Sequence, residues 1–267
     1  MIPKIIHYCW FGGNELPELA QKCIESWKKY CPDYQIRRWD ESNFDIECCD
    51  FVKEAYDMKK WAFVSDYARL KIIYNEGGIY LDVDVELIKN IDVLLENKCY
   101  LGEEEIGYVN TGLGFGAEKN NSVILKLIEE YEGKHFIQDN GNLDTIPCPE
   151  KNTLPIKSMG YNNCLNGIWK IDSLTIYPPD YFCPIDYETG NMCITANTYS
   201  IHHFSALWHT KFDRIILKID TNSITNTRIE HIIRRCISFP IRIINKIKII
   251  GLKSALILAI SKLRKEK

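Results

Sequence analysis

Residues 61–87, WAFVSDYARLKIIYNEGGIYLDVDVEL, decide the fold that this chain is expected to adopt. An apolar, helix-compatible run ends at Gly77-Gly78, where glycine suits the left-handed residue that follows many helices. The stretch 79–87 then alternates apolar and polar residues, as a strand with one buried face does. The segment therefore predicts a helix, a glycine stop, and a strand with Asp82 and Asp84 on the same side.

Two carboxylates on one strand face predict a cation site. Like charges this close either raise one pKa or recruit a cation. A hard divalent ion such as Mn²⁺ or Mg²⁺ prefers oxygen ligands and keeps open positions for phosphate oxygens. The alternative is a solvated polar face on a half-buried strand, against which stand the low strand preference of Asp and the apolar opposite face. We therefore predict that Asp82 and Asp84 hold a metal ion.

The helix before this strand carries a second charged pair. Asp66 and Arg69 are three residues apart and share a helix face with Leu70 and Ile73. Charged groups on an apolar stripe need a partner. They either pair only with each other or both point into a polar pocket, and the sequence favours neither reading. Ser65 could cap this helix, or the helix could begin earlier.

The rest of the chain reads as an alternation of strands and helices. Pro17 lies near the start of an amphipathic helix, and one of Asn120, Asn121 and Ser122 is expected to cap a later one. Residues 133–158 contain three prolines and are expected to be rich in loops. The predicted strands are 2–6, 34–39, 113–117, 176–184 and 199–208, and the predicted helices are 17–30, 51–58, 91–96 and about 122–131.

Two further places offer functional side chains. Trp10 follows the first predicted strand and precedes Gly12-Gly13, so its ring either plugs the core or stacks on a ligand at the strand end. His202 and His203 are adjacent in the last predicted strand. Because neighbouring strand residues face opposite ways, one histidine can enter a site and the other cannot.

Composition places the chain among ordinary globular α/β proteins. It has 267 residues, of which 46% are hydrophobic and 26% charged. The 11 cysteines are odd in number, form no C-x-x-C, and include adjacent Cys48 and Cys49, so they favour reduced thiols in a cytoplasmic protein over a disulfide framework. The N-terminus does not resemble a signal peptide, and no run of 18 apolar residues predicts a membrane span.

Charge divides the chain into an acidic body and a basic tail. Residues 228–267 contain 11 Lys and Arg against two acidic residues, a net charge of +9, which leaves −12 on residues 1–227. The segments 228–235 and 241–265 look like amphipathic helices broken at Pro240 and Gly251, and they either pack on the body or lie on a membrane surface. We expect the membrane surface, not nucleic acid, as the partner of this extension over residues 211–267.

Residues 1–210 contain four informative blocks: IPKIIHYCWFGG, SDYARLKIIYNEGGIYLDVDV, YVNTG and YSIHHFSALW. Through these blocks the chain resembles glycosyltransferases of the GT-A fold with a D-x-D motif. It is closest to the sugar-binding-region family 32, which includes bacterial capsular polysaccharide transferases and the initiating α-1,6-mannosyltransferase of yeast. It also resembles the catalytic domain of the large clostridial glucosylating toxins.

The resemblance implies an α/β, Rossmann-like mixed sheet flanked by helices, with a helical basic extension. It implies that Trp10 stacks on the nucleobase and that Asp66 and Arg69 contact the donor sugar and phosphate. Of the histidines, His203 fits better, because Phe204 follows it. The implied metal ligands are Asp82, Asp84 and His203 or His202, and the implied donor-binding residues are His7, Trp10, Asp66, Arg69, Tyr80, Asp82, Asn110 and Trp208.

The implied reaction moves a sugar from a UDP- or GDP-sugar to a saccharide or lipid-linked saccharide, with retention at the anomeric carbon, in the synthesis of cell-surface polysaccharide. The implied location is the inner face of the plasma membrane, with peripheral attachment. A Gly-Pro pair common before the family's acceptor region is missing, and Thr145-Ile146-Pro147 is the nearest match. The rival functions are a haloacid-dehalogenase-like phosphatase, which shares the D-x-D letters, and a non-catalytic carbohydrate-binding protein on the same fold.

Overall fold

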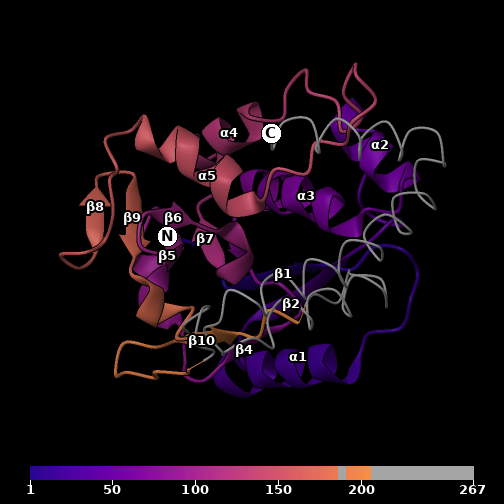
Figure 1. Ribbon diagram of the computed structural model, residues 1–267. Coiled ribbons are helices and arrows are strands. Elements are labelled where there is room, and N and C mark those ends of the chain that lie inside the picture. Colours follow the sequence, from indigo (N-terminus) through magenta and orange to yellow (C-terminus); the bar gives the residue numbers. More distant parts are fainter. Residues whose placement is uncertain (186–190, 206–267) are drawn as a thin grey trace, which may run out of the picture. The chain divides into compact units, whose positions relative to one another are not determined.

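A mixed eight-stranded sheet forms the centre of the computed structural model, which describes residues 1–185 and 191–205 (Figure 1). Its order is β2-β1-β3-β7-β5-β9-β8, and β6 pairs with β5. The pairs β1–β2, β1–β3 and β5–β9 are parallel, and the other pairs are antiparallel. The strands are β1 (Ile5–Cys9), β2 (Gln35–Trp39), β3 (Gly78–Tyr80), β5 (Cys99–Glu105), β6 (Tyr108–Val109), β7 (Phe115–Ala117), β8 (Trp169–Ile171) and β9 (Leu174–Tyr177).

Helices cover both faces of this sheet, which confirms the expected α/β class. Helix α1 (Glu18–Tyr30) packs its buried Trp27 against Tyr8 of β1, with the ring centroids 5.7 Å apart. Helix α3 (Trp61–Glu76) packs on β1 from the other side, together with α2 (Asp50–Asp57), α4 (Ser122–Glu129) and α5 (Cys148–Lys157) (Figure 1). Three short 3₁₀ helices complete the set: η1 (Asp92–Glu96), η2 (Thr111–Leu113) and η3 (Pro179–Tyr181).

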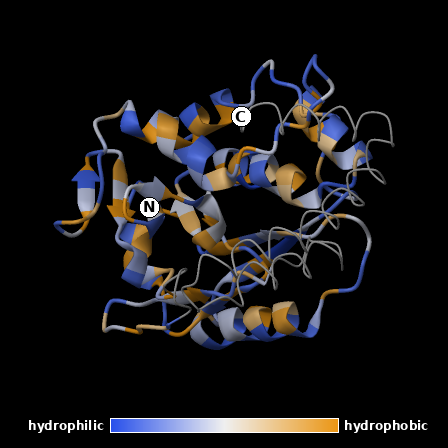
Figure 2. Cartoon of the chain, in the orientation of Figure 1, coloured by the Kyte–Doolittle hydropathy of each residue, from blue (hydrophilic) through white to orange (hydrophobic). Residues whose placement is uncertain are grey.

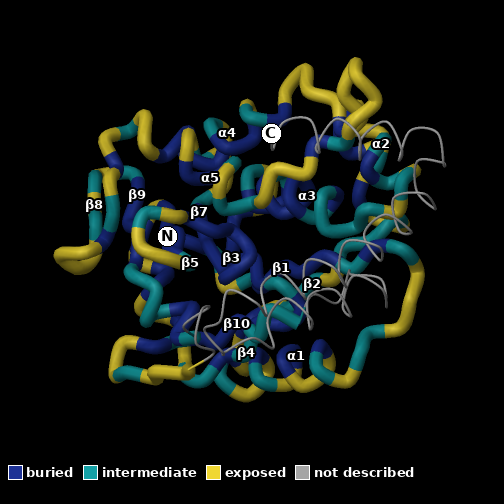
Figure 3. The backbone as a smooth tube through the Cα atoms, viewed as in Figure 1, coloured by how far each residue is buried: buried dark blue, intermediate teal, exposed yellow. Residues whose placement is uncertain are grey.

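Burial follows the alternation that the sequence predicts. Hydrophobic and hydrophilic residues alternate along α1 and α4 (Figure 2), and most of their apolar residues are buried, although Leu125 of α4 is exposed. Strands β3 and β7 and much of α3 are buried, while the outer side of α1 is exposed (Figure 3). Asn121 caps α4 by accepting a hydrogen bond from the backbone N–H of Val123 at 2.9 Å, as expected of this asparagine cluster.

The decisive segment differs from its prediction in one respect. Helix α3 ends at Glu76 as predicted, and Gly77 follows with a φ of 68°. The predicted continuous strand over residues 79–87 is wrong, because it is broken after β3. The backbone N–H of Val85 donates to the carbonyl of Asp82 at 3.0 Å and closes a turn. Asp82 and Asp84 therefore lie in a turn between two sheets and not along one strand face.

A second, two-stranded sheet begins where this turn ends. Strand β4 (Val85–Leu87) pairs antiparallel with β10 (Ser200–His202), with His202 opposite Val85. This pairing joins positions more than 110 residues apart, and Trp27 of α1 supports it by donating to the Val85 carbonyl at 2.7 Å. The late strand is thereby brought to the aspartate turn.

Some smaller expectations are corrected, and the strands β5, β6 and β8 were not predicted. The first strand begins at Ile5, not at Ile2. Strand β5 was not predicted at all, although all its residues from Cys99 to Glu103 are buried. The supposedly loop-rich stretch contains α5, whose Pro147 and Pro149 stand at its N-terminal end, where a missing N–H costs little.

Among the described residues, no helix is long and apolar enough to cross a membrane. The expected boundary after residue 210 and the basic extension over residues 211–267 lie outside the described residues.

Candidate functional site

Three potential metal ligands meet at the turn between the two sheets. One ligand atom from each of Asp82, Asp84 and His202 lies within 4.8 Å of the other two. Two of these residues come from the turn after β3, and the third comes from β10. Each of the three is buried or largely buried, so the charges of the carboxylates need compensation.

Asp82 is held from the helix side. Its Oδ1 accepts a hydrogen bond from the Tyr80 hydroxyl at 2.8 Å and lies 3.4 Å from Nη2 of Arg69. The same Nη2 lies 2.9 Å from Oδ1 of Asp66. Arg69 therefore bridges two carboxylates, so the reading in which Asp66 and Arg69 pair only with each other is wrong: they pair and also face the aspartate turn.

Burial governs the protonation of these two acids. It raises the pKa of Asp66 to about 6, against the lowering effect of Arg69. It also raises the pKa of Asp82, again opposed by Arg69. A cation at this place would lower both values, because it would favour the ionised carboxylates.

Asp84 is held from the opposite side by residues of the last strand and the loop after it. Its Oδ1 lies 3.2 Å from Nε2 of His202. Its Oδ2 accepts from the backbone N–H of Ser205 at 2.9 Å and from the Ser205 hydroxyl at 2.6 Å. Burial alone would raise the pKa of Asp84, but these hydrogen bonds outweigh it and hold the pKa well below its usual range. Conversely, Asp84 raises the pKa of His202 despite the burial of the imidazole.

The two adjacent histidines face opposite ways, as predicted. His203 turns away from the aspartate pair, and its Nε2 lies 2.9 Å from Oε2 of Glu86. The structure thus brings His202 to the carboxylates, which corrects the preference for His203. The signal that favoured His203 was the following Phe204, whereas the ring of Phe204 packs edge-on against His202, with centroids 4.2 Å apart.

The residues present fit a divalent metal ion. Two carboxylates and an imidazole are ligands that Mn²⁺ accepts, and carboxylates suit Mg²⁺. Nδ1 of His202 is buried and has no hydrogen-bond partner among the described residues, so the ring is only half satisfied. Asp82, Asp84 and His202 would hold the ion.

Asn110 closes the site from the loop before η2. Its Oδ1 accepts from the backbone N–H of Gly112 at 2.6 Å, which fixes the start of η2. A Cβ atom on Gly112 would lie 2.7 Å from Oδ2 of Asp82 and 3.2 Å from Nη1 of Arg69. Glycine is therefore required here because the backbone passes directly against the charged groups.

The remaining predicted residues have different environments. Trp10 lies at the end of β1, half-buried, and its Nε1 donates to the carbonyl of Asn14 at 2.7 Å. His7 is fully buried, contacts the Gly77 carbonyl and the Trp39 indole, and has a pKa lowered to about 4 by burial. The His7 carbonyl accepts from the backbone N–H of Leu81 at 3.0 Å, but the contacts of its imidazole are with Gly77 and Trp39 and not with the aspartates. Trp208 lies outside the described residues.

Sequence reasoning missed several polar neighbours of the site. Sγ of Cys148, at the start of α5, lies 3.3 Å from the Thr111 hydroxyl and 3.9 Å from Nη1 of Arg69. The Asn110 amide donates to Glu104 at the end of β5. Cys148 could not be placed because α5 was not predicted. Ser205 lies in the block YSIHHFSALW, and its hydroxyl, three residues after His202, was the feature that could have marked it as a polar neighbour of the site.

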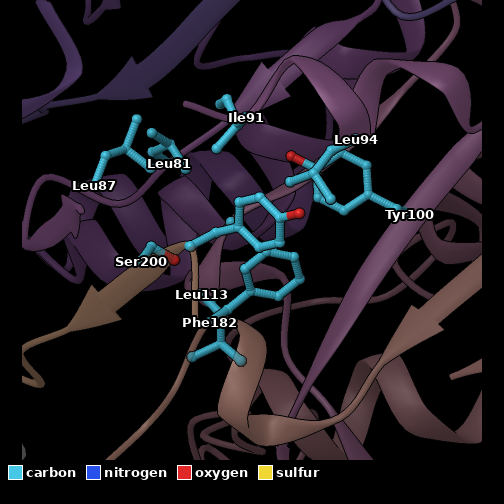
Figure 4. A pocket seen from close by; sticks show the side chains of 10 residues that line it. Leu81, Leu87, Ile91, Leu94, Tyr100, Leu113, Phe182 and Ser200 are labelled. Carbon is cyan, nitrogen blue, oxygen red and sulfur yellow. The ribbon is translucent and has the colours of Figure 1, made fainter. Parts of the chain in front are cut away.

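A mainly apolar pocket adjoins the aspartate turn through Leu81 (Figure 4). Leu81, which directly precedes Asp82, contributes to it, and so does Ser200 of β10. The pocket lies between residues of the two sheets. Because its other walls are apolar or aromatic, it contributes no metal ligand to the site. Further lining residues are Leu87, Ile91, Leu94, Tyr100, Leu113 and Phe182.

The chain is similar to glycosyltransferases in sequence and in structure. The family model described as "Glycosyltransferase sugar-binding region containing DXD motif" matches residues 17–101. An uncharacterized glycosyltransferase of Acanthamoeba polyphaga mimivirus, L373, is 36% identical over 220 residues, which are 75% of this chain and 83% of that protein.

Inositol phosphoceramide mannosyltransferase 3 of Schizosaccharomyces pombe is 35% identical over 136 residues, 48% of this chain. The chain spans only 36% of the length of that relative. Among solved structures, the PaToxG glycosyltransferase is similar with a TM-score of 0.47 and 18% identity, over 59% of this chain and 69% of that one.

Proposed function

Because this chain belongs to the glycosyltransferase family whose sugar-binding region contains the DXD motif, we propose that it transfers a sugar from a nucleotide-sugar donor to a hydroxyl of a saccharide acceptor. The observation that carries the proposal is the meeting of Asp82, Asp84 and His202 beside the buried Arg69. This arrangement suits a diphosphate with a divalent cation.

Each group has a distinct task in this proposal. A bound Mn²⁺ or Mg²⁺ would act as a Lewis acid on the diphosphate. Arg69 supplies a permanent positive charge, which stabilises the negative charge that grows on the departing diphosphate. Asp66 and Asn110 hydrogen-bond the sugar hydroxyls, Tyr80 fixes the carboxylate of Asp82, and Trp10 offers its half-buried ring to the nucleobase.

The stereochemical course that we propose is retention, by attack of the acceptor on the same face that the diphosphate leaves. UDP- and GDP-sugars are the candidate donors. Because the Schizosaccharomyces pombe relative is named a mannosyltransferase of inositol phosphoceramide, GDP-mannose is the first donor to test and a lipid-linked saccharide the first acceptor class. The proposed context is synthesis of cell-surface polysaccharide.

The test is a panel of sugar nucleotides with and without Mn²⁺. A donor that binds the native state raises the melting temperature by mass action, and turnover releases the nucleoside diphosphate. We expect Asp84→Asn to lower this release on the order of 1000-fold, since metal contacts supply several kcal/mol. Glu86→Gln is the matched control, because Glu86 lies two residues further on and pairs with His203 instead.

Unchanged turnover in Asp84→Asn would remove the metal assignment. Binding of a sugar nucleotide without any release of diphosphate would favour the non-catalytic carbohydrate-binding alternative. The phosphatase alternative requires the D-x-D on the first strand, whereas Asp82 follows β3, the third strand in chain order.

The proposal extends to location. The basic residues after Arg228 would attach the enzyme peripherally to the inner face of the plasma membrane by attraction to anionic lipids. Deletion of residues 228–267 should then release the protein from phosphatidylserine vesicles. Equal sedimentation of both forms with the vesicles would refute this attachment.

A further inference from the structure

Glu104 stands at an irregular place in the sheet. Strand β5 pairs with β6 through Glu103 opposite Val109 and Glu105 opposite Tyr108, and the register shifts between these two pairs. Glu104 is the residue at this irregularity. Bulges of this kind re-aim a side chain and are common beside active sites.

The three consecutive glutamates of β5 have different surroundings. Glu103 is fully buried, and its Oε1 accepts from the Tyr161 hydroxyl and from two backbone N–H groups. Glu105 is exposed. Glu104 lies between these extremes: its Oε2 accepts from Nδ2 of Asn110. Of the three, only Glu104 has a hydrogen bond to a residue of the proposed site among the described residues.

The field around Glu104 supports the same placement. Burial raises the pKa of Glu104, and the nearby imidazole of His202 opposes this rise. In turn, Glu104 contributes to raising the pKa of His202, behind the larger contribution of Asp84. Glu104 thus reaches the site from β5 through its hydrogen bond with Asn110, while His202 reaches it from β10.

Asn110 separates Glu104 from the charged groups of the donor site. Its amide nitrogen faces Glu104, and its Oδ1 holds Gly112, whose Cα lies against Asp82 and Arg69. A sugar that contacts Asp82, Arg69 and Asn110 thus has the Glu104 carboxylate at its edge. A second hydroxyl compound must approach that edge to attack the sugar.

We infer that Glu104 contacts the attacking hydroxyl, which it orients by accepting a hydrogen bond from its O–H. This inference rests on the proposed sugar transfer. The attacking oxygen forms a bond to the anomeric carbon while the bond from that carbon to the diphosphate oxygen breaks, and the departing diphosphate takes the electron pair and the hydroxyl proton. Glu104 fixes the direction of the O–H, and such positioning accounts for a large part of many rate enhancements.

The hydroxyl belongs to the saccharide acceptor in transfer and to water in donor hydrolysis, so hydrolysis alone can test the inference. Glu104→Gln keeps an oxygen for the Asn110 amide, but it turns an NH₂ group, a donor, toward the attacking O–H. The probes are GDP-mannose and UDP-glucose with Mn²⁺. The readouts are the kcat and KM of nucleoside diphosphate release. Glu105→Gln, one residue along the chain and exposed, is the matched control.

We expect Glu104→Gln to lower kcat of hydrolysis by at least about tenfold with donor KM within about twofold, since only an interaction made beyond donor binding is removed. Glu105→Gln should match the wild type. Equal kcat in Glu104→Gln and the wild type, with a raised donor KM only in Glu104→Ala, would overturn the inference, because Glu104 would then merely position Asn110. If the wild type releases no diphosphate from any sugar nucleotide, the proposed function itself fails.

Discussion

The two aspartates of the turn are held in different ways. Asp82 is held by its own neighbourhood in the chain: Tyr80 lies two residues before it, and Arg69 lies in the preceding helix. Asp84 is held by His202 and Ser205, about 120 residues later. The first carboxylate has a partner whose charge is permanent, and the second has a titratable partner, His202, whose pKa Asp84 raises. The charge of Arg69 therefore stays constant with pH, whereas the charge of His202 does not.

Replacement of Arg69 should cause the largest loss of stability, because Asp66 and Asp82 then lose their cation. Arg69→Met leaves Asp66 and Asp82 buried without a cation, and breaking a buried pair typically costs about 3–5 kcal/mol of unfolding free energy. Chemical denaturation measures it. Arg37→Met is the matched control, since Arg37 pairs with Glu76 at the surface and such pairs contribute about 0–1 kcal/mol. A loss in Arg69→Met no larger than in the control would show that burial of these acids needs no compensation.

Replacement of His202 should weaken the second side in a pH-dependent way. The folded pKa of His202 is raised and that of Asp84 is lowered. Their mutual stabilisation is therefore fully present between about pH 3.9 and pH 6.5. It is lost as the pH rises through the His202 pKa and also as the pH falls through the Asp84 pKa. We expect His202→Gln to cost about 1.5–3 kcal/mol of unfolding free energy at pH 6 and less at pH 9 without metal.

The loss in Arg69→Met should instead be larger at pH 9 than at pH 6, because Asp66, whose pKa is about 6, is partly protonated at pH 6 and fully charged at pH 9. Metal affinity should rise with pH, whereas the stabilisation from the His202–Asp84 pair falls, because a metal ion needs the neutral imidazole. Isothermal titration with Mn²⁺ should therefore show affinity that increases from pH 6 to pH 8 in the wild type. A pH-independent loss in His202→Gln would contradict the assignment of a charged His202.

Gly112→Ala tests how closely the backbone approaches the first side. The new methyl group would lie 2.7 Å from Oδ2 of Asp82, so the carboxylate or η2 must move. Overpacking of this kind typically costs about 1–3 kcal/mol of unfolding free energy. We also expect a weaker rise of the melting temperature with Mn²⁺. An unchanged response to Mn²⁺ would mean that Asp82 adjusts without loss of binding.

His203→Gln should have the smallest effect. His203 pairs with Glu86, whose side chain is 43% exposed, so its replacement should change the unfolding free energy by less than about 0.5 kcal/mol. Differential scanning calorimetry of His203→Gln and His202→Gln compares the adjacent histidines directly. Equal losses would contradict the placement of only one of them in the site.

The sequence-level predictions succeeded where the signal is local. The end of α3 at Gly77, the cap at Asn121 and the opposite directions of His202 and His203 depend on a few neighbouring residues. The break after β3 depends instead on β10 pairing with β4, a contact across the chain that alternation alone cannot reveal.

The same distinction explains the parts of the site that were missed. The partners of Asp82, Tyr80 and Arg69, lie within one quoted block and were expected in the site as donor-binding residues, whereas Glu104 lies in a strand that was not predicted. Cys148 lies in α5, and the three prolines in and beside this helix led to the prediction of a loop. A local motif thus identified the site, and long-range packing decided which side chains complete it.

The pairing of β4 with β10 involves only three residues on each strand, from Ser200 opposite Leu87 to His202 opposite Val85. Short ladders of this kind open more readily than the strands of a central sheet, and such local opening can be followed by amide hydrogen exchange. Opening here would release Asp84 from His202 and Ser205, while Asp82, Arg69 and Asp66 would keep their contacts. The proposed metal site thus joins a region expected to exchange slowly to one expected to exchange quickly, and bound metal should slow exchange mainly in β4 and β10.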